Sequence, residues 1–351
     1  MATSSPGAAP PIRIAVDGMG GDDAPGAVVE GAVEAARRFG DRLAPILVGD
    51  ETRLQGELRR LRAGSLGIEV VHAGQQVDMD ESGAEAFRKK RDSSMAVATR
   101  LVKDGAASGV FSAGNTGAMV AASLLNMGRI PGLTRPALAT LIPTSGERPW
   151  AILLDVGATA ECKPIHLYQF AILGEHYARI ILDIQRPRVG LLNIGEESSK
   201  GTELAQEAHV LMTRRANFVG NVEGRDILNG LADVVVTDGF TGNVMLKFAE
   251  SVWSWTVSMV RKELGEHVLA KVGALLLKPS FKRIRERMDY TEYGGAPLLG
   301  VDGICIIGHG SSNSKAIRNG IRFVADLVES GLNDEIRNEV EREQGGQVVG
   351  S

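Results

Sequence analysis

Two strand-to-helix turns of the same kind lie within residues 189–247, and this stretch constrains the fold more than any other. In the first, the apolar run Val189–Leu192 is typical of a buried parallel strand, and Thr202 opens a helix whose apolar residues share one face. In the second, Val234–Val236 forms the strand. The first turn of the next helix carries Thr241, Gly242 and Asn243. Strands that alternate with helices in this way predict a mostly parallel sheet covered by helices.

Both turns are expected at the carboxyl ends of their strands. Helix N-termini point unpaired N–H groups outward at this edge of an open α/β sheet, so anions and substrates collect there. Lys200 follows the first strand and Asn243 follows the second. We therefore expect the two side chains to lie close together at this edge of the sheet.

A glycine turn, DGMGGDD, follows the apolar strand predicted at Ile12–Val16. Its glycines allow the backbone to approach a ligand closely, and Asp22 or Asp23 is expected to cap the helix that Pro25 starts. A plain structural turn and a phosphate site both explain this pattern, because one glycine cluster is a weak motif. The turn does not contain GxGxxG with an acidic residue about 20 positions later, which weakens a dehydrogenase interpretation.

A second turn, SAGNTGA, links the strand predicted at Gly109–Phe111 to a helix that is apolar almost all round and must be buried. Polar groups at the start of a buried helix need partners. Asn115 and Thr116 therefore either satisfy neighbouring loops or face a ligand.

A third turn, GHGSS, follows the strand predicted at Ile304–Ile307. Ser311 or Ser312 is expected to cap the next helix, which Gly331 ends. Residues 332–351 are rich in Glu and are expected to form an acidic, frayed tail.

Four consecutive basic residues, Arg88–Arg91, precede Ser93 and Ser94, which are expected to start a helix. The run is either a solvated helix end or a docking site for an acidic partner or a phosphate.

Cys162 and His166 flank Pro164 at the start of a long amphipathic helix. A thiol activated by a base takes an acyl group from a thioester, so one interpretation is a nucleophile and its base. The other is packing and capping, because no orienting carboxylate lies at a recognisable spacing. No metal motif is expected, since the six histidines are scattered and neither cysteine has a partner.

Composition argues against several classes of protein. The 39 basic and 43 acidic residues give a net charge of −4, which predicts no bulk attraction to nucleic acid. Only Cys162 and Cys305 are present, which favours a reducing cytoplasm over a disulfide framework. No run of about 18 apolar residues predicts a membrane span. Residues 1–11 lack the basic and apolar regions of a signal peptide and are expected to form a disordered tail.

Residues 249–290 depart from the α/β alternation and predict consecutive helices that form a protruding tip. Their apolar residues occupy more than one helix face, which exceeds the single stripe that packs on a sheet. They are Trp253, Trp255, Val257, Met259, Val260, Val268, Leu269, Val272, Leu275, Leu276 and Leu277. Residues 261–288 also contain eight basic and three acidic residues. This combination predicts either an interfacial helix attracted to anionic lipid or a buried dimer contact with a solvated basic edge.

Several strings of the chain resemble the phosphate acyltransferases of the PlsX type. The central stretch supplies NIGEESSKG, FVGNVEGRDI and DGFTGNVMLK, and the strings DGMGGD, KKRDSSM, AGNTGA, LLDVGA, YGGAPLLG and HGSS occur around it in family order. The resemblance implies a three-layer α/β/α Rossmann-like fold with a mostly parallel sheet. It makes residues 12–331 a single catalytic domain with a helical tip insertion at 249–290.

The resemblance implies that the chain converts an acyl carrier protein thioester and inorganic phosphate to acyl phosphate and free carrier protein, in the synthesis of phosphatidic acid. Lys200 matches the family's catalytic lysine and would hold phosphate or polarise the carbonyl. Asn243 matches the catalytic asparagine and would donate to the tetrahedral oxyanion. Phosphate is anionic at neutral pH and a thiol of pKa about 8.5 is a fair leaving group, so direct attack needs no strong base. The expected phosphate- and substrate-binding residues are Asp17, Gly18, Gly20, Gly21, Asp22, Gly114, Asn115, Thr116, Gly117, Gly242, His309, Gly310, Ser311 and Ser312.

The resemblance implies no metal and no organic cofactor. It implies a cytoplasmic homodimer, bound peripherally to the inner face of the cell membrane through the helical tip. Acyl carrier protein would be the acyl donor, and a downstream glycerol-3-phosphate acyltransferase is a further implied partner. Two alternatives stay open: a phosphotransacetylase-like enzyme that uses acyl-CoA, and a non-catalytic protein that binds phosphate or acyl chains.

Overall fold

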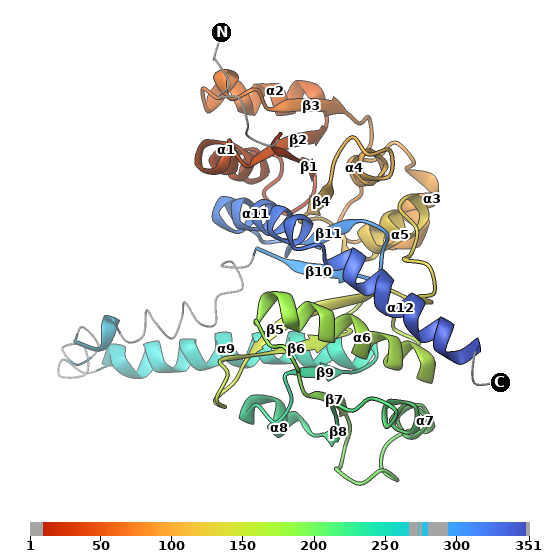
Figure 1. Cartoon of the computed structure of the whole chain (residues 1–351). Coiled ribbons are helices and arrows are strands. Elements are labelled where there is room, and N and C mark those ends of the chain that lie inside the picture. The colour runs from red at the N-terminus through yellow and green to blue at the C-terminus, as the bar shows by residue number, and fades with distance from the viewer. Residues whose placement is uncertain (1–9, 267–272, 274–275, 280–293, 349–351) are drawn as a thin grey trace. The chain divides into compact units, whose positions relative to one another are not determined.

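The computed structural model describes residues 10–266, 273, 276–279 and 294–348 (Figure 1). The chain forms two compact units. Unit 1 comprises Met1–Gly132 and Tyr290–Ser351, and unit 2, inserted between them, comprises Leu133–Asp289. The expectation of one catalytic domain over residues 12–331 stays a prediction.

The described strands of unit 1 are β1 (Ile12–Asp17), β2 (Leu43–Gly49), β3 (Glu69–His72), β4 (Gly109–Ser112), β10 (Ala296–Leu299) and β11 (Ile304–Ile307). They pair in the order β3-β2-β1-β4-β11-β10, and every pair is parallel except β10 with β11. The helices are α1 (Gly26–Phe39), α2 (Glu51–Arg60), the 3₁₀ turn η1 (Gly64–Leu66), α3 (Gly83–Lys89), α4 (Ser94–Lys103), α5 (Thr116–Asn126), α11 (Ser314–Ser330) and α12 (Leu332–Val348). Helices α1 and α11 pack together on one face of this sheet, and α4 packs with α5 on the other (Figure 1).

The described strands of unit 2 are β5 (Ala137–Pro143), β6 (Trp150–Leu154), β7 (Val189–Leu192), β8 (Phe218–Val222) and β9 (Val234–Val236). They pair in the order β5-β6-β9-β7-β8, and only β5 runs antiparallel to its neighbour. The helices are α6 (Pro164–Ile181), α7 (Glu203–Met212), α8 (Gly224–Asn229) and α9 (Gly239–Glu266). Helix α6 packs against α7, β6 and β9, while α9 contacts β6 and α8 contacts β5.

Short apolar runs form the buried strands, as the sequence predicts. All residues of β4 and of β9 are buried, which suits parallel strands covered on both faces. Side-chain caps also begin the predicted helices: Ser93, Asn115 and Thr202 each accept a hydrogen bond from the backbone N–H three residues later. The predicted α/β fold class with mostly parallel strands is thus confirmed.

Two expected helix caps are wrong. Neither Asp22 nor Asp23 caps α1, because Pro25 holds the N-cap position and no side chain bonds there. Neither Ser311 nor Ser312 caps α11, because that helix begins later in the chain. Its cap is Asn313, whose side-chain oxygen accepts from the N–H of Ala316 at 3.0 Å.

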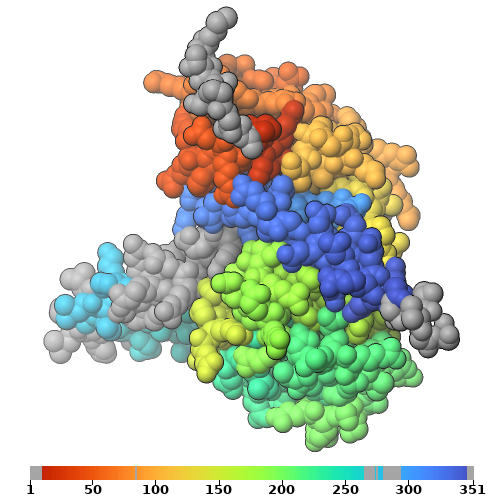
Figure 2. Space-filling view, in the orientation of Figure 1, coloured from red at the N-terminus to blue at the C-terminus, as the bar shows by residue number. Residues whose placement is uncertain are grey.

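The expectation of a frayed tail is wrong for residues 332–348, which form α12. Leu332, Ile336 and Val340 are spaced by four, so they share one face of the helix, and all three are almost fully buried. The prediction of a frayed tail rested on the Glu-rich composition and missed this apolar face, because the acidic residues occupy the other faces of the helix. In the space-filling view, α12 contributes a strip of the surface (Figure 2).

Helix α9 begins at Gly239, ten residues before the predicted helical tip, and runs without a break to Glu266. It extends beyond the strands of its own unit (Figure 1). Residues 276–279 are helical as well. The rest of the predicted tip lies outside the described residues, including Val268, Leu269, Val272 and Leu275. Within the described part of the chain, no helix is long and apolar enough to cross a membrane.

Candidate functional site

Strands β6, β9 and β7 of unit 2 are adjacent and parallel, so their carboxyl ends meet at one edge. Val236 at the end of β9 pairs with Leu154 of β6 and with Leu191 of β7. The polar residue that follows β6 is Asp155, and the turns after β9 and β7 carry Asn243 and Lys200. This topology agrees with the prediction that Lys200 and Asn243 lie at the same edge of the sheet. The role of these residues stays a prediction.

The turn that carries Lys200 is held by its own backbone. The N–H of Lys200 donates to the carbonyl of Glu197 at 3.0 Å, and its carbonyl accepts from the side-chain amide of Asn193 at 3.0 Å. The side chain is exposed and forms no ion pair with any residue that the structure describes. Its charge is therefore available to an anionic ligand.

Asn243 is half-buried and is the fifth residue of α9, just after its first turn. Asp238 fixes that first turn, because its carboxylate accepts from the N–H of Thr241 at 2.9 Å and from the hydroxyl of Thr241 at 2.7 Å. The amide of Asn243 faces Gly157, where an added Cβ would lie 3.7 Å from the Asn243 Cγ. Among the described residues, this amide has no hydrogen-bond partner.

Asp155 is fully buried and accepts four backbone hydrogen bonds. Its Oδ1 accepts from Leu138 at 2.8 Å, Gly157 at 3.1 Å and Ala158 at 2.9 Å, and its Oδ2 accepts from Thr159 at 2.6 Å. Burial raises the pKa of Asp155 to about 6, and the four N–H donors oppose that shift. Sequence reasoning did not select Asp155 as a site residue, although LLDVGA places it directly after an apolar strand.

Cys162 and His166 have the geometry of packing and capping groups. The Cys162 thiol donates to the carbonyl of Thr159 at 3.5 Å, and burial, with the nearby charge of Asp155, raises the pKa of Cys162 to about 12. The Nδ1 of His166 accepts from the N–H of Lys163 at 3.0 Å, and burial lowers the pKa of His166. A protonated thiol and an imidazole that caps a helix are poorly suited to act as a nucleophile and its base.

Two predicted phosphate turns of unit 1 pack directly on each other. Asp17 is buried, and its carboxylate accepts from the N–H of Met19 at 3.2 Å and from the hydroxyl of Ser112 at 2.7 Å. Burial raises the pKa of Asp17. A Cβ added at Gly20 would lie 2.4 Å from the Asp17 Oδ2 and 2.8 Å from the backbone nitrogen of Gly114. Only glycine permits this approach at position 20.

The third turn of unit 1 joins the same group of loops. The N–H of Asp22 donates to the carbonyl of Gly310 at 2.8 Å, and a Cβ at Gly21 would lie 3.2 Å from that oxygen. His309 hydrogen-bonds Ser311 at 2.8 Å. Gly18 does not join this group, because it packs against Val48 and Leu54.

The side chain of Asn115 is committed to neighbouring backbone. Its oxygen accepts from the N–H of Ala118 at 2.9 Å, and its nitrogen donates to the carbonyls of Met79 at 3.1 Å and Glu81 at 2.8 Å. Of the two roles that the sequence left open, this geometry fits the satisfaction of neighbouring loops. Ser312 differs, since it is buried and its hydroxyl has no partner in the described part of the chain.

The basic run of residues 88–91 is partly neutralised by its own neighbours. Lys89 pairs with Glu85 at 2.6 Å, and Lys90 pairs with Glu81. Arg88 and Arg91 are exposed and form no ion pair among the described residues.

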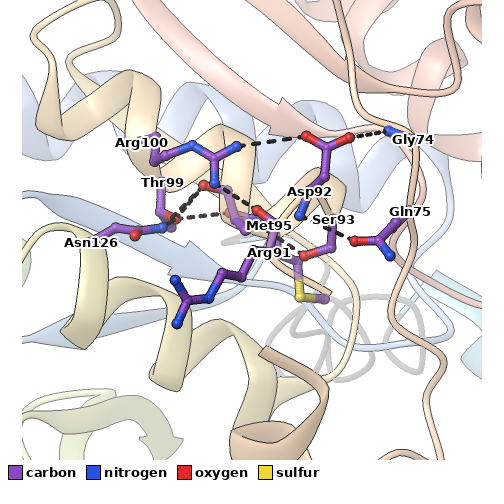
Figure 3. Close-up of polar contacts among 10 residues, drawn as sticks. Gly74, Gln75, Arg91, Asp92, Ser93, Met95, Thr99, Arg100 and Asn126 are labelled. Atoms are coloured by element: carbon purple, nitrogen blue, oxygen red, sulfur yellow. Dashed lines mark hydrogen bonds and ion pairs between the residues drawn. The ribbon is translucent and has the colours of Figure 1, made fainter. Parts of the chain in front are cut away.

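Figure 3 shows the contacts that anchor the end of this run. The carboxylate of Asp92 accepts from the N–H of Gly74 at 3.0 Å and lies 3.8 Å from Arg100, which donates to the carbonyl of Arg91 at 2.6 Å. The guanidinium of Arg91 takes part in none of the contacts drawn (Figure 3). Only the two arginines of the run therefore remain available to an acidic partner.

No group of three His, Cys, Asp or Glu residues that could hold a metal ion occurs among the described residues. The two units together define an α/β protein whose polar loops follow parallel strands and begin helices. Such edges suit the binding of anionic ligands.

Comparison with known proteins agrees with an α/β protein that binds anionic ligands. A family model described as "Fatty acid synthesis protein" matches residues 12–335. A phosphate acyltransferase from Pelotomaculum thermopropionicum is 48% identical over 343 residues, which cover 96% of this chain and 99% of that relative. A phosphate acyltransferase from Geobacter sulfurreducens is 46% identical over 333 residues, with 95% of each chain covered. The chain therefore belongs to the fatty acid synthesis protein family.

A solved structure of a phosphotransacetylase from Streptococcus pyogenes is similar in fold, with a TM-score of 0.60 at 18% identity. The match covers 91% of this chain and 94% of that one. At this identity the likeness supports the fold alone.

Proposed function

We propose that the chain transfers the acyl group of an acyl carrier protein thioester to inorganic phosphate. Family membership and the relatives named phosphate acyltransferase make the chain an enzyme that transfers an acyl group to phosphate. One structural observation carries the assignment of roles in unit 2. At the edge formed by β6, β9 and β7, the polar groups of Asp155 and Cys162 are committed to the fold, whereas the ammonium of Lys200 and the amide of Asn243 have no partner in the described chain.

In this reaction a phosphate oxygen attacks the thioester carbonyl carbon, and a tetrahedral oxyanion forms. The C–S bond then breaks, and the carrier leaves as a thiolate that takes a proton from solvent. Lys200 holds the phosphate or polarises the carbonyl, and Asn243 donates to the oxyanion. One such donor contributes on the order of 3 kcal/mol of transition-state stabilisation.

The experiment mixes purified protein, palmitoyl carrier protein and phosphate, and follows acyl phosphate and free thiol together. Equal amounts of both support the reaction. Lys200→Ala and Asn243→Ala are each expected to lower kcat by roughly 100- to 1000-fold, whereas Cys162→Ala stays near the unmodified rate. An acyl group trapped on Cys162 would contradict direct attack by phosphate.

The same assay separates the alternatives. Faster turnover with acyl-CoA than with the carrier thioester would indicate a phosphotransacetylase-like enzyme. Stoichiometric binding without phosphate-dependent thiol release would indicate a binding protein.

We assign phosphate and substrate binding to the glycine loops of unit 1 and, within unit 2, to Gly242. Ser312 offers the sharpest test there, because its hydroxyl is buried and has no partner in the described chain. Ser312→Ala is expected to raise the KM for phosphate several-fold without unfolding the protein. An unchanged KM would remove Ser312 from the binding residues.

The exposed face of α9 supports the proposed homodimer. Six large apolar side chains spaced by three or four residues share this face and are 41–69% exposed: Phe240, Val244, Phe248, Val252, Trp255 and Met259. We expect Phe248→Glu with Trp255→Glu to convert a dimer to monomers in light scattering. A dimer that survives this double change would place the interface elsewhere.

The tip is proposed to meet the inner face of the cell membrane, where a glycerol-3-phosphate acyltransferase would consume the acyl phosphate. Leu276 and Leu277 are 78% and 51% exposed, and residues 276–279 reach the surface in Figure 2. Replacing both leucines with Glu is expected to abolish binding to anionic vesicles while activity on soluble substrate persists. Loss of the dimer with vesicle binding intact would instead assign these leucines to the subunit interface.

A further inference from the structure

We propose that Asp155 is a positioning residue that holds the amide of Asn243 in place for acyl transfer. The inference rests on the proposed function, because it gives Asp155 a role only through Asn243.

The carboxylate of Asp155 organises the loop that follows β6. Its two oxygens accept from Gly157, Ala158 and Thr159, which are consecutive in the chain, and from Leu138 on β5. A carboxylate that receives four N–H donors fixes the path of this loop, because every donor loses its partner if the loop moves.

The same loop is the surface on which α9 begins. A Cβ added at Gly242 would lie 1.9 Å from the Asp155 carbonyl oxygen, and one added at Gly239 would lie 2.5 Å from the Asp155 Oδ2. The N–H of Gly239 also donates to the carbonyl of Thr159 at 2.9 Å. The first turn of α9 therefore packs directly against Asp155 and the loop that follows it.

Gly157 brings the loop to Asn243 itself. Its N–H donates to the Asp155 Oδ1, and its Cα faces the Asn243 amide, since a Cβ there would lie 3.7 Å from Cγ and 4.0 Å from Oδ1. A shift of the loop thus moves the surface that limits where the amide of Asn243 can point. Displacements of about 1 Å are enough to lower catalysis by roughly 100-fold.

The ionisation of Asp155 gives this role a measurable signature. Its pKa is raised to about 6 by burial, so the carboxylate accepts all four bonds above this pH and becomes protonated below it. Protonation turns one of the carboxylate oxygens into an O–H donor. This O–H then faces backbone N–H groups that are donors themselves, so hydrogen bonds are lost and the loop loosens.

Several titratable or charged groups surround the Asp155 loop. The charges of Asp155, Asp238 and Arg135 influence the pKa of Cys162. The charges of Arg135 and Lys163 influence the pKa of His166. Cys162 stays protonated throughout, because its pKa is about 12. His166 needs a control, because it is a further ionisable group near this loop and burial lowers its pKa.

The first test is a double-mutant cycle of Asp155→Asn and Asn243→Ala, measured as kcat with palmitoyl carrier protein and phosphate. Asp155→Asn alone is expected to lower kcat by roughly 10- to 100-fold with little change in KM. In the Asn243→Ala background, the same substitution is expected to lower kcat by less than about threefold. Multiplicative losses would overturn the inference. If Asn243→Ala alone leaves kcat unchanged, the proposed role of Asn243 fails, and this outcome is distinct from the failure of Asp155.

The second test needs no change at Asp155, so it holds even if Asp155→Asn does not fold. The ratio of kcat for the unmodified enzyme to kcat for Asn243→Ala is measured from pH 5 to pH 8. Protonation of phosphate affects both enzymes alike and cancels in this ratio. The ratio is expected to fall about tenfold or more as the pH drops through about 6, and the same fall is expected in a His166→Gln background. A ratio independent of pH, or a fall that His166→Gln removes, would overturn the inference.

Discussion

Gly242→Ala is the smallest change that tests the packing of α9 on the loop after β6. The added Cβ would lie 1.9 Å from the carbonyl oxygen of Asp155. Real Cβ atoms essentially never approach another heavy atom below 3.0 Å, so the two backbones must separate by at least 1.1 Å, because 3.0 less 1.9 is 1.1. Both partners are backbone, and no flexible side chain can move aside.

A displacement of about 1 Å predicts a loss of roughly 100-fold in kcat, because Asn243 is the next residue of the same helix. The overpacking itself is expected to lower the free energy of unfolding by about 1–3 kcal/mol. Turnover is measured on the carrier thioester, and stability is measured by chemical denaturation with the same preparation.

Gly224→Ala is the matched control. Gly224 also lies in the first turn of a unit 2 helix that follows a parallel strand, but an added Cβ there meets no atom within 4 Å. Its kcat and stability are expected to stay close to those of the unmodified enzyme. If Gly242→Ala keeps a kcat within threefold of the Gly224→Ala value, the start of α9 does not need this close approach and the reasoning is refuted.

Three further predictions concern other parts of the chain. Charge reversal at Arg88 and Arg91, which form no ion pair with any described residue, is expected to raise the KM for the carrier substrate and weaken its dependence on salt. An unchanged KM at low salt would exclude this patch. Ile336→Ala is expected to cost about 2–5 kcal/mol in chemical denaturation, because this α12 side chain is fully buried, and a cost below 1 kcal/mol would mean that α12 is not packed. Glu175→Gln is expected to cost about 3–5 kcal/mol, since it removes the buried negative charge that accepts from Arg215 at 2.6 and 3.0 Å. Glu175→Leu with Arg215→Met should cost far less, and equal costs would contradict this account.

Local chemistry in the sequence was enough to predict much of unit 2. An apolar run followed by a glycine-rich turn predicts a buried parallel strand and the helix after it, and β7 and β9 have this form. Thr202 caps α7 as predicted, because a hydroxyl before an amphipathic run needs only local geometry to reach the backbone N–H three residues later. Neighbouring parallel strands then bring the turns of Lys200 and Asn243 to one edge.

Contacts between residues distant in sequence were not predictable in this way. Leu138 donates to Asp155 across β5 and β6, so the pattern after β6 alone does not identify Asp155 as a buried acceptor. Lys90 forms an ion pair with Glu81, nine residues earlier in the chain. Asn115 is similar, since its amide bonds carbonyls more than 30 residues before it. In each case the residue type was informative, but the partner depends on tertiary structure.

The roles that we propose at the unit 2 edge follow from what each polar group already binds. Asp155 accepts four backbone bonds, so it serves the loop and cannot also take a proton from phosphate without releasing a donor. Cys162 is held protonated by burial and by the charge of Asp155, which removes the thiolate that a covalent route requires. Lys200 and Asn243 have no such commitments among the described residues, and they supply a cation and a neutral N–H donor. These are the two groups that the proposed attack by anionic phosphate needs, because positioning and charge stabilisation then replace general-base catalysis.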